Sequence, residues 1–412
     1  MSFSIIVLLI VFGLIAVRQV GAFRIQIWQA MMLGALAVLL SGQISASEAF
    51  AAINFDVMLF LFGMFVVGSA LEESGYLSHL AYKSFRRAGT VDSLILSILF
   101  GVGLASAFLM NDTCAVIWTP VMLFLAREHN VSAKLLLLAL AFAITLGSVP
   151  SPIGNPQNLL VAVNGDVQDP FTAFLWFLFL PTILNLFIAY LLLKLFYRKH
   201  FHKIPLRHSE KPVKDAGLAR LSRSSLILIS VMIFVKIAIA YVDRDFDFRL
   251  TYIALVGAAP ILFLSTRRIE ILKKTDWHTL IFFASMFVLM QSVWDSGFFQ
   301  RVINGSDVEI TSVPAILSVS VVLSQLISNV PLVALYLPML LHAGVTTKAL
   351  MALAAGSTVA GNLFILGAAS NVIIIQNAEK KGETLTFMEF ARIGIPLTML
   401  NTLVYWVFLS FI

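Results

Sequence analysis

Long apolar segments follow one another along almost the whole chain, separated by short polar or basic stretches. Most of them approach about 20 residues, the length an α-helix needs to cross the hydrocarbon core of a bilayer. The pattern predicts an all-α polytopic membrane protein. We expect spans over residues 3–20, 25–44, 55–72, 171–197, 224–241, 250–266, 277–294 and 386–411, hairpins over 92–127 and 312–341, and broken spans over 132–163 and 345–376.

Four polar stretches interrupt this apolar pattern at bilayer depth. Two are MNDTCAVIWTP (Met110–Pro120) and LISNVPLVALYLP (Leu326–Pro338), in which an Asn precedes a Pro by nine residues. The other two are GSVPSPIGNPQN (Gly147–Asn158) and AGNLFILGAASN (Ala360–Asn371), where Pro and Gly favour unwinding of the helix. Irregular backbone is tolerated in a membrane only inside protein or beside a watery cavity. We therefore expect two hairpin tips and two broken helices to form an internal site.

The two halves of the chain have the order of a duplicated sequence. Asn111 and Asn329 are separated by the same interval as Pro120 and Pro338. Further pairs follow in the same order at slowly drifting intervals: Phe23 and Phe248, Gly34 and Gly257, Met64 and Met286, Ser74 and Ser296, Gly154 and Gly367, Asn158 and Asn371, and Pro181 and Pro396. We interpret residues 1–197 and 224–412 as two repeats, each with five crossings and one re-entrant hairpin. An odd number of crossings inverts the second repeat relative to the first.

Composition and charge agree with a membrane protein. Of the 412 residues, 59% are hydrophobic and 12% are charged, about half the charged share of a typical soluble protein. Lys and Arg gather in loops that the span assignment places on one side, including the linker 198–223 and Lys380–Lys381. Positive loops are typically cytoplasmic. We therefore predict a protein of the cell (inner) membrane with a cytoplasmic linker, both termini outside the cytoplasm and no nucleic-acid partner.

The breaks carry groups that can bind ions. Unwound carbonyls can ligate a hard cation such as Na⁺, and a half-helix that restarts points its N–H groups at an anion. An acid at bilayer depth is costly and usually functional, so Asp112 is a candidate ligand for Na⁺ or carrier of a coupled proton. Asp112 could equally cap the helix that follows it, and both interpretations stay open.

Other chemical candidates favour plainer roles. Lys236 is the clear intramembrane base, and we expect it to snorkel to the outer surface. The single cysteine, Cys114, excludes an intramolecular disulfide and a thiolate metal cluster, and its expected role is that of a small apolar filler. The sequence contains no H-E-x-x-H, P-loop or G-x-S-x-G motif. We predict no enzymatic activity and no cofactor other than Na⁺ as a candidate coupling ion.

The stretches MNDTCAVIWTP, SPIGNPQNLL and GNLFILGAASNVII resemble the paired signatures of the ion transporter superfamily. That group includes arsenite permeases, divalent anion:sodium symporters, citrate–metal carriers and some sodium/proton antiporters, and the arsenite-permease-like branch is the most similar. The resemblance implies a scaffold with a transport domain, often in a homodimer that moves by an elevator-like shift. It also implies one half-site made of Asn111, Asp112, Thr113, Gly154, Asn155 and Asn158, with Na⁺ near Asn111, Asp112, Gly154 and Asn155. The other half-site would consist of Ser328, Asn329, Val330, Gly367, Ser370 and Asn371.

The expected function is cation-coupled secondary transport of a small anion or oxyanion, such as an arsenite-like solute, an inorganic anion or a carboxylate. The dicarboxylate symporters carry Ser-Asn-Thr at both tips, and this chain does not, which weakens the case for a dicarboxylate. A sodium/proton antiporter on the same scaffold is the alternative, in which Asp112 exchanges the two cations. An intramembrane hydrolase would need a nucleophile with a base or a carboxylate pair at depth, and only Asp112 qualifies.

Overall fold

The computed structural model describes residues 3–17, 19–20, 23–167, 169–201, 213–242, 250–298 and 311–411. Its elements are helical apart from a two-residue antiparallel pairing of β1 (Gln19–Val20) with β2 (Phe23–Arg24). The prediction of an all-α polytopic protein is thereby confirmed. In the described part of the chain, four segments are long and apolar enough to cross a membrane: Val91–Phe108, Pro170–Phe196, Trp277–Asp295 and Phe387–Phe411.

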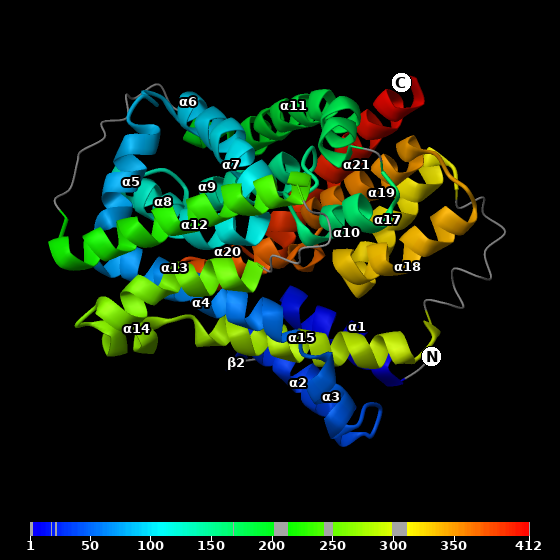
Figure 1. The fold of residues 1–412 in the computed structure, drawn as a ribbon, viewed down its shortest axis with the longest axis horizontal. Coiled ribbons are helices and arrows are strands. Elements are labelled where there is room, and N and C mark those ends of the chain that lie inside the picture. The colour runs from blue at the N-terminus through cyan, green and yellow to red at the C-terminus, as the bar shows by residue number, and fades with distance from the viewer. Residues whose placement is uncertain are drawn as a thin grey trace. The chain divides into compact units, whose positions relative to one another are not determined.

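The chain forms two compact units, and each unit combines segments from both halves of the sequence. Unit 1 comprises residues 1–80 and 210–306. Its helices are α1 (Phe3–Val17), α2 (Ile27–Leu40), α3 (Ala46–Ala52), α4 (Phe55–Glu73), α12 (Ala216–Val242), α13 (Leu250–Leu264), α14 (Arg268–Lys274) and α15 (Trp277–Asp295). Helix α5 (Tyr76–Phe85) begins in this unit and ends in the other (Figure 1).

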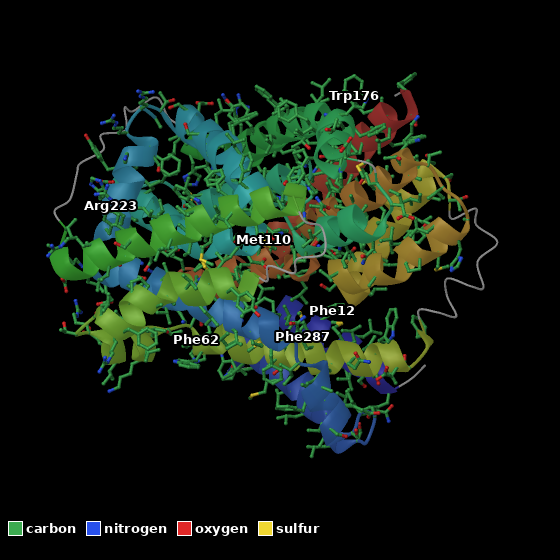
Figure 2. The ribbon with its side chains drawn as sticks, viewed as in Figure 1. Phe12, Phe62, Met110, Trp176, Arg223 and Phe287 are labelled. Atoms are coloured by element: carbon green, nitrogen blue, oxygen red, sulfur yellow. The ribbon has the colours of Figure 1, made fainter. Side chains whose placement is uncertain are left out.

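Unit 2 comprises residues 81–209 and 307–412 and contains all four polar breaks. Its elements from the first half are α6 (Val91–Leu96), the π-helix η1 (Ser97–Val102), α7 (Gly103–Leu109), α8 (Asn111–His129), α9 (Ala133–Ser148), α10 (Pro156–Asn164), α11 (Pro170–Phe196) and η2 (Arg198–His200). Those from the second half are α17 (Val313–Ile327), α18 (Asn329–His342), α19 (Thr347–Val359), η3 (Ala360–Asn362), η4 (Ile365–Gly367), α20 (Ala369–Glu379) and α21 (Phe387–Phe411). Its outer surface exposes large apolar side chains such as Trp176, which is 71% exposed (Figure 2).

Two of the predicted features fall partly outside the described residues. Most of the basic linker does so, because residues 202–212 are not described and α12 already begins at Ala216. The side chain of Lys236 also lies outside them. The inverted repeat and the re-entrant hairpins stay predictions.

Helix packing within unit 1 follows the pattern that a repeat would produce. Helix α2 packs along α15, and α4 packs along α13. The predicted repeat matches α2 with α13 and α4 with α15, so the two contacts are counterparts. Close approach depends on glycine, because a Cβ on Gly63 would lie 2.7 Å from the carbonyl oxygen of Ala254.

Basic side chains of unit 2 join helix ends that are far apart in the sequence. Lys194 Nζ lies 2.5 Å from Asp92 Oδ1, and Arg127 Nη2 donates to the carbonyl oxygen of Lys381 over 2.9 Å. Lys134 pairs with Glu389. These contacts place the start of α6 beside the end of α11, the end of α8 beside the loop before α21, and the start of α9 beside the start of α21.

A network of exposed charges joins three segments of unit 1. Arg267 Nη2 and Nε each lie 2.8 Å from a carboxylate oxygen of Glu270, and Lys274 Nζ lies 2.7 Å from Glu73 Oε2. Arg267 Nη1 also reaches Asp215 Oδ2 at 3.3 Å. The hydrogen bond from the Arg267 guanidinium, followed by that from Lys274, lowers the pKa of Glu270 from 4.5 to about 2.

This network predicts a pH-dependent contribution to stability. Because the pKa of Glu270 is lower in the folded protein, the ionised acid stabilises the fold above pH 4.5, and this is lost as the pH falls towards about 2. We expect Glu270→Gln to melt at a lower temperature than the parent at pH 7, with a difference that shrinks between pH 4.5 and 2. Glu383→Gln is the control, and an E270Q difference that persists at pH 2 would contradict the assignment.

Candidate functional site

The two hairpin tips share an unusual backbone geometry. Between α7 and α8, Met110 has φ 58° and ψ 146°. Between α17 and α18, Ser328 has φ 70° and ψ 160°. Non-glycine residues occupy this region only when the surrounding structure enforces it. Both tips are thus sharply defined, and neither α8 nor α18 begins with a side-chain cap.

Contacts between the halves bring tips and breaks together within unit 2. The backbone N–H of Asn111 donates to the carbonyl oxygen of Gly154 over 3.0 Å, which joins the first tip to the first break. Helix α8 packs along α20, and α18 packs along α10 (Figure 1). Each outgoing hairpin helix therefore lies against the half-helix of the other half of the chain.

The first break satisfies its own backbone. The Nδ2 group of Asn158 lies within hydrogen-bonding distance of three carbonyl oxygens at the end of α9, those of Ser148 at 3.2 Å, Val149 at 3.1 Å and Ser151 at 2.9 Å. Asn155 caps α10, since its Oδ1 accepts from the N–H of Asn158 over 2.8 Å. The two hydrogens of this amide are thus shared among three of the carbonyls that unwinding would expose, and the carbonyl oxygen of Gly154 accepts from Asn111, which leaves fewer free oxygens for a cation to bind.

One hydroxyl from the second half completes this first break. Thr358, near the end of α19, donates to Asn158 Oδ1 over 3.1 Å. Its oxygen accepts from Asn155 Nδ2 over 3.2 Å and lies 3.5 Å from Gln157 Nε2. All four side chains are buried. Thr358 therefore holds three side chains of the other half in place.

The second break repeats only part of this arrangement. Asn371 Nδ2 donates to the carbonyl oxygen of Gly361 over 2.6 Å. This is the counterpart of the bond from Asn158 to Ser148, because Ser148 and Gly361 are separated by the same interval as Asn158 and Asn371. By the same interval, Thr145 corresponds to Thr358 and Asn371 to Asn158. The counterpart of the bond from Thr358 to Asn158 would therefore join Thr145 Oγ1 to Asn371 Oδ1. Both are buried without a hydrogen-bond partner among the described residues.

The start of α20 is also open. Ala368 stands where the first half has the capping Asn155, and α20 has no side-chain cap. The second residue of the helix, Ser370, is fully buried, and its Oγ has no hydrogen-bond partner in the described part of the chain. An uncapped helix start with a free hydroxyl can bind a polar or anionic ligand.

Further unpartnered polar groups belong to the second half. Gln325 Nε2 donates to the carbonyl oxygen of Ala360 over 2.8 Å, but its Oε1 has no partner among the described residues. Gly367 is required beside it, because a Cβ there would lie 2.8 Å from Oε1 of Gln325. Asn329 Oδ1 and both polar atoms of Asn362 are likewise buried without partners in the part of the chain that the structure describes.

Asp112 is half-buried in the first turn of α8. Its Oδ1 is inaccessible and has no hydrogen-bond partner in the described structure, which argues against a capping role for that oxygen. The side chain of Thr113 lies outside the described residues. At the other tip the side chain of Ser328 is half-buried, and Val330 is 36% exposed, so Asp112 has no acidic counterpart there.

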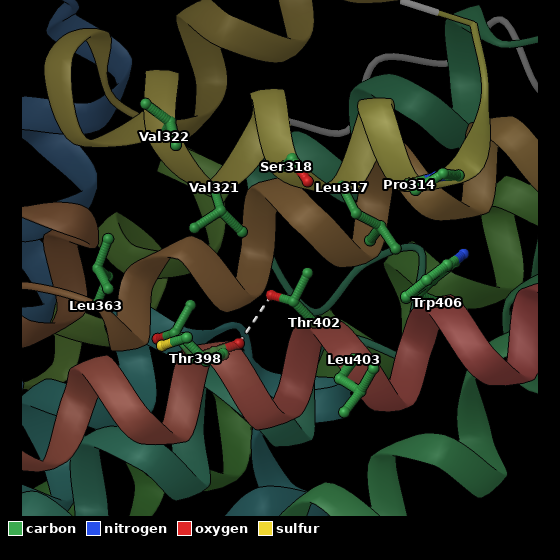
Figure 3. A pocket seen from close by; sticks show the side chains of 11 residues that line it. Pro314, Leu317, Ser318, Val321, Val322, Leu363, Thr398, Thr402, Leu403 and Trp406 are labelled. Atoms are coloured by element: carbon green, nitrogen blue, oxygen red, sulfur yellow. Dashed lines mark hydrogen bonds between the residues drawn. The ribbon is translucent and has the colours of Figure 1, made fainter.

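The sequence analysis missed Thr145, Thr358 and Gln325. Thr145 and Thr358 are separated by the same interval as Gly154 and Gly367, so the repeat itself contained a signal. Gln325 stands just before the second hairpin tip, and no sequence pattern marked it as a site residue. A pocket of about 350 Å³ between α17 and α21 is lined by none of the predicted site residues, although Leu363 of the second break contributes to it (Figure 3).

Comparisons with known proteins give the family and the fold neighbours. Residues 6–349 match the model of the family described as Citrate transporter. The P protein of Mus musculus is 27% identical over 470 aligned positions, 90% of this chain and 56% of its own, so the chain spans about half of that relative. The Silicon efflux transporter LSI3 of Oryza sativa subsp. japonica is 27% identical over 90% of each chain. The solved YdaH transporter of Alcanivorax borkumensis is 15% identical, with a TM-score of 0.47, over 99% of this chain and 96% of its own.

The role of Thr358 can be tested by removing its hydroxyl. Thr358→Val leaves the amides of Asn155 and Asn158 short of partners, a cost of about 1–3 kcal/mol. We expect a lower melting temperature and about tenfold slower transport of the solute. Thr358→Ser keeps the hydroxyl and should restore both.

A matched control is Thr402→Val, because Thr402 bonds only within its own helix, to the carbonyl oxygen of Thr398. The account is wrong if Thr358→Val transports like the parent, or if Thr358→Ser is as impaired as Thr358→Val.

Proposed function

Because this chain belongs to the citrate transporter family, we propose that it is a secondary active transporter that moves a small anion or oxyanion across a membrane. The coupling ion is Na⁺ or a proton. The homodimer, the inner-membrane location and the extracytoplasmic termini predicted from the sequence are part of the same proposal.

The observation that carries the proposal is the open start of α20. Its N–H groups lack a side-chain cap, and the buried Ser370 Oγ and Asn371 Oδ1 beside them lack partners among the described residues. Helix N-termini favour negative charge, and the Ser370 hydroxyl can donate a hydrogen bond to it, whereas Asn371 Oδ1 can accept one from a hydroxyl group of the solute. This supports a solute rich in oxygen atoms.

The electrostatics of the site limit the charge that it can hold. The stretches 110–120, 147–158, 326–338 and 360–371 contain no Lys or Arg. An anion bound here would depend on helix N-termini and on the coupled cation for positive charge, and an uncharged hydroxide of a metalloid would fit as well. The family description names citrate and the rice relative's name refers to silicon, so both solutes belong in a test of this chain.

The coupling ion is suggested by what remains unpaired at the first tip. Sequence analysis placed Na⁺ near Asn111, Asp112, Gly154 and Asn155. The carbonyl oxygen of Gly154 and the side chain of Asn155 are already hydrogen-bonded. The carboxylate of Asp112 keeps an unpartnered oxygen within the described structure, which suits a proton better than a multiply coordinated Na⁺.

A sodium/proton antiporter is the second candidate, and the same free carboxylate favours it. In that case Asp112 would exchange the two cations with no solute involved. The unpartnered polar groups of the second break then have no role, which is why we place this function second.

Reconstitution into proteoliposomes tests the proposal directly. The panel contains arsenite, silicic acid, sulfate, phosphate, citrate and succinate, each with an imposed Na⁺ or proton gradient. We expect uptake of one oxygen-rich solute that depends on the proton gradient and is absent from protein-free liposomes. If folded protein moves no solute under either gradient, but exchanges Na⁺ for protons, the antiporter is the correct function.

Asp112→Asn separates the two candidates further. A symporter whose proton resides on Asp112 loses gradient-driven uptake but keeps exchange of solute across the membrane, because exchange needs no net proton movement. An antiporter loses all transport. Unchanged gradient-driven uptake in Asp112→Asn would remove Asp112 from the coupling step.

A further inference from the structure

Buried polar side chains also gather where α11 packs along α21, on elements that carry none of the predicted site residues. The sequences are TILN at Thr182–Asn185 and TMLN at Thr398–Asn401, and they stand directly after the repeat-matched Pro181 and shortly after Pro396. Asn185 and Asn401 are both 0% exposed, and the two threonines are buried as well. The sequence analysis gave this pair of motifs no role.

Two contacts fix how the helices face each other. The guanidinium of Arg392, near the start of α21, lies 5.3 Å from the ring centre of Phe196 at the end of α11. Thr182 Oγ1 lies 2.6 Å from the hydroxyl of Tyr405, so an earlier part of α11 meets a later part of α21. The helices therefore run antiparallel.

This register brings the two asparagines together. Asn185 follows Thr182 by about one helical turn, and Asn401 precedes Tyr405 by about one turn. In an antiparallel pair both steps lead to the same level, so Asn185 faces Asn401. Thr398 Oγ1 lies about one further turn back along the same face of α21.

The facing amides do not bond to each other. Neither polar atom of Asn401 has a hydrogen-bond partner among the described residues, and the same is true of Thr398 Oγ1. Asn185 lies close enough to the Tyr405 hydroxyl to interact with it, but neither of its polar atoms makes a hydrogen bond of good geometry in the described part of the chain. Buried amides without hydrogen bonds are rare because they are costly. A small group that lies between the two side chains would satisfy them.

The donor and acceptor balance identifies the ligand. Each amide offers one acceptor and one NH₂ donor group. A cation would satisfy the oxygens and leave the NH₂ groups unpaired, and an anion would do the reverse. Water both donates and accepts, and a buried water typically makes about three hydrogen bonds to groups of this kind.

We propose that water is bound between Asn185 and Asn401, at the centre of the α11–α21 crossing, with the Thr398 hydroxyl as a third partner. Pro181 stands four residues before Asn185 and Pro396 five residues before Asn401, and each proline weakens the helical turn that precedes it. Because the helices run antiparallel, the hydrated crossing lies between these two weakened turns.

An experimental map of the full-length protein in lipid nanodiscs tests the site. We expect a density peak within hydrogen-bonding distance of both side-chain amides. Two amides that bond directly to each other, or an empty space between them, would overturn the proposal.

Thermal unfolding of variants gives a second, independent readout. Asn185→Leu and Asn401→Leu each leave one amide and its water unsatisfied, so each should lower the melting temperature. The double variant removes both amides and should lose less than the two single losses together. Met399→Leu is the control for substitution in this helix, because Met399 is 68% exposed.

Additive losses in the double variant would show that the two sites are independent and would contradict a shared water. Melting in NaCl, KCl and choline chloride at equal ionic strength should be the same for the parent. Stabilisation specific to Na⁺ that Asn185→Leu abolishes would identify a bound cation and overturn the assignment to water.

Discussion

The structure of unit 2 depends on how an interrupted helix satisfies its carbonyl groups where no bulk water can reach them. In the first break a single amide, Asn158 Nδ2, lies within hydrogen-bonding distance of three carbonyls at the end of α9. In the second break Asn371 does the same for Gly361. Without these bonds the unwound backbone would be unpaired inside an apolar environment, which is excluded within a membrane.

The two breaks differ in how completely their polar side chains are hydrogen-bonded. Thr358 completes the first one, so that Asn155 and Asn158 are fully engaged with protein. The mirrored Thr145 and Asn371 do not bond to each other, and Ala368 replaces the cap of the following helix. The first break therefore has a structural character, and the second retains the groups that can bind a solute. Sequence analysis already connected Asp112 with the coupling ion, and that interpretation is kept. The difference is that we now connect solute recognition mainly with the second break.

Sequence reasoning reached the helical membrane fold and the positions of the interruptions because apolar runs, Pro and Gly act locally. Helices do end at Ser148 and at Val359 and restart at Pro156 and Ala369. The superfamily resemblance is confirmed by the family match, which is to a transporter family and not to an enzyme family; the arsenite-permease-like branch stays a prediction. The bond from Thr358 to Asn158 joins residues far apart in the chain, and no local pattern predicts it. Which polar groups stay unpaired is likewise decided by tertiary contacts.

The central claim is that solute binds at the second break, and Ser370 tests it most directly. The measurement is the shift in melting temperature that the transported solute produces in the parent and in Ser370→Ala. We predict an unchanged melting temperature without solute, because Ser370 Oγ has no partner in the described structure, and a solute-induced shift that needs about tenfold more ligand, the factor that corresponds to one lost hydrogen bond of about 1.4 kcal/mol. The same shift at the same solute concentration in both proteins would contradict the account.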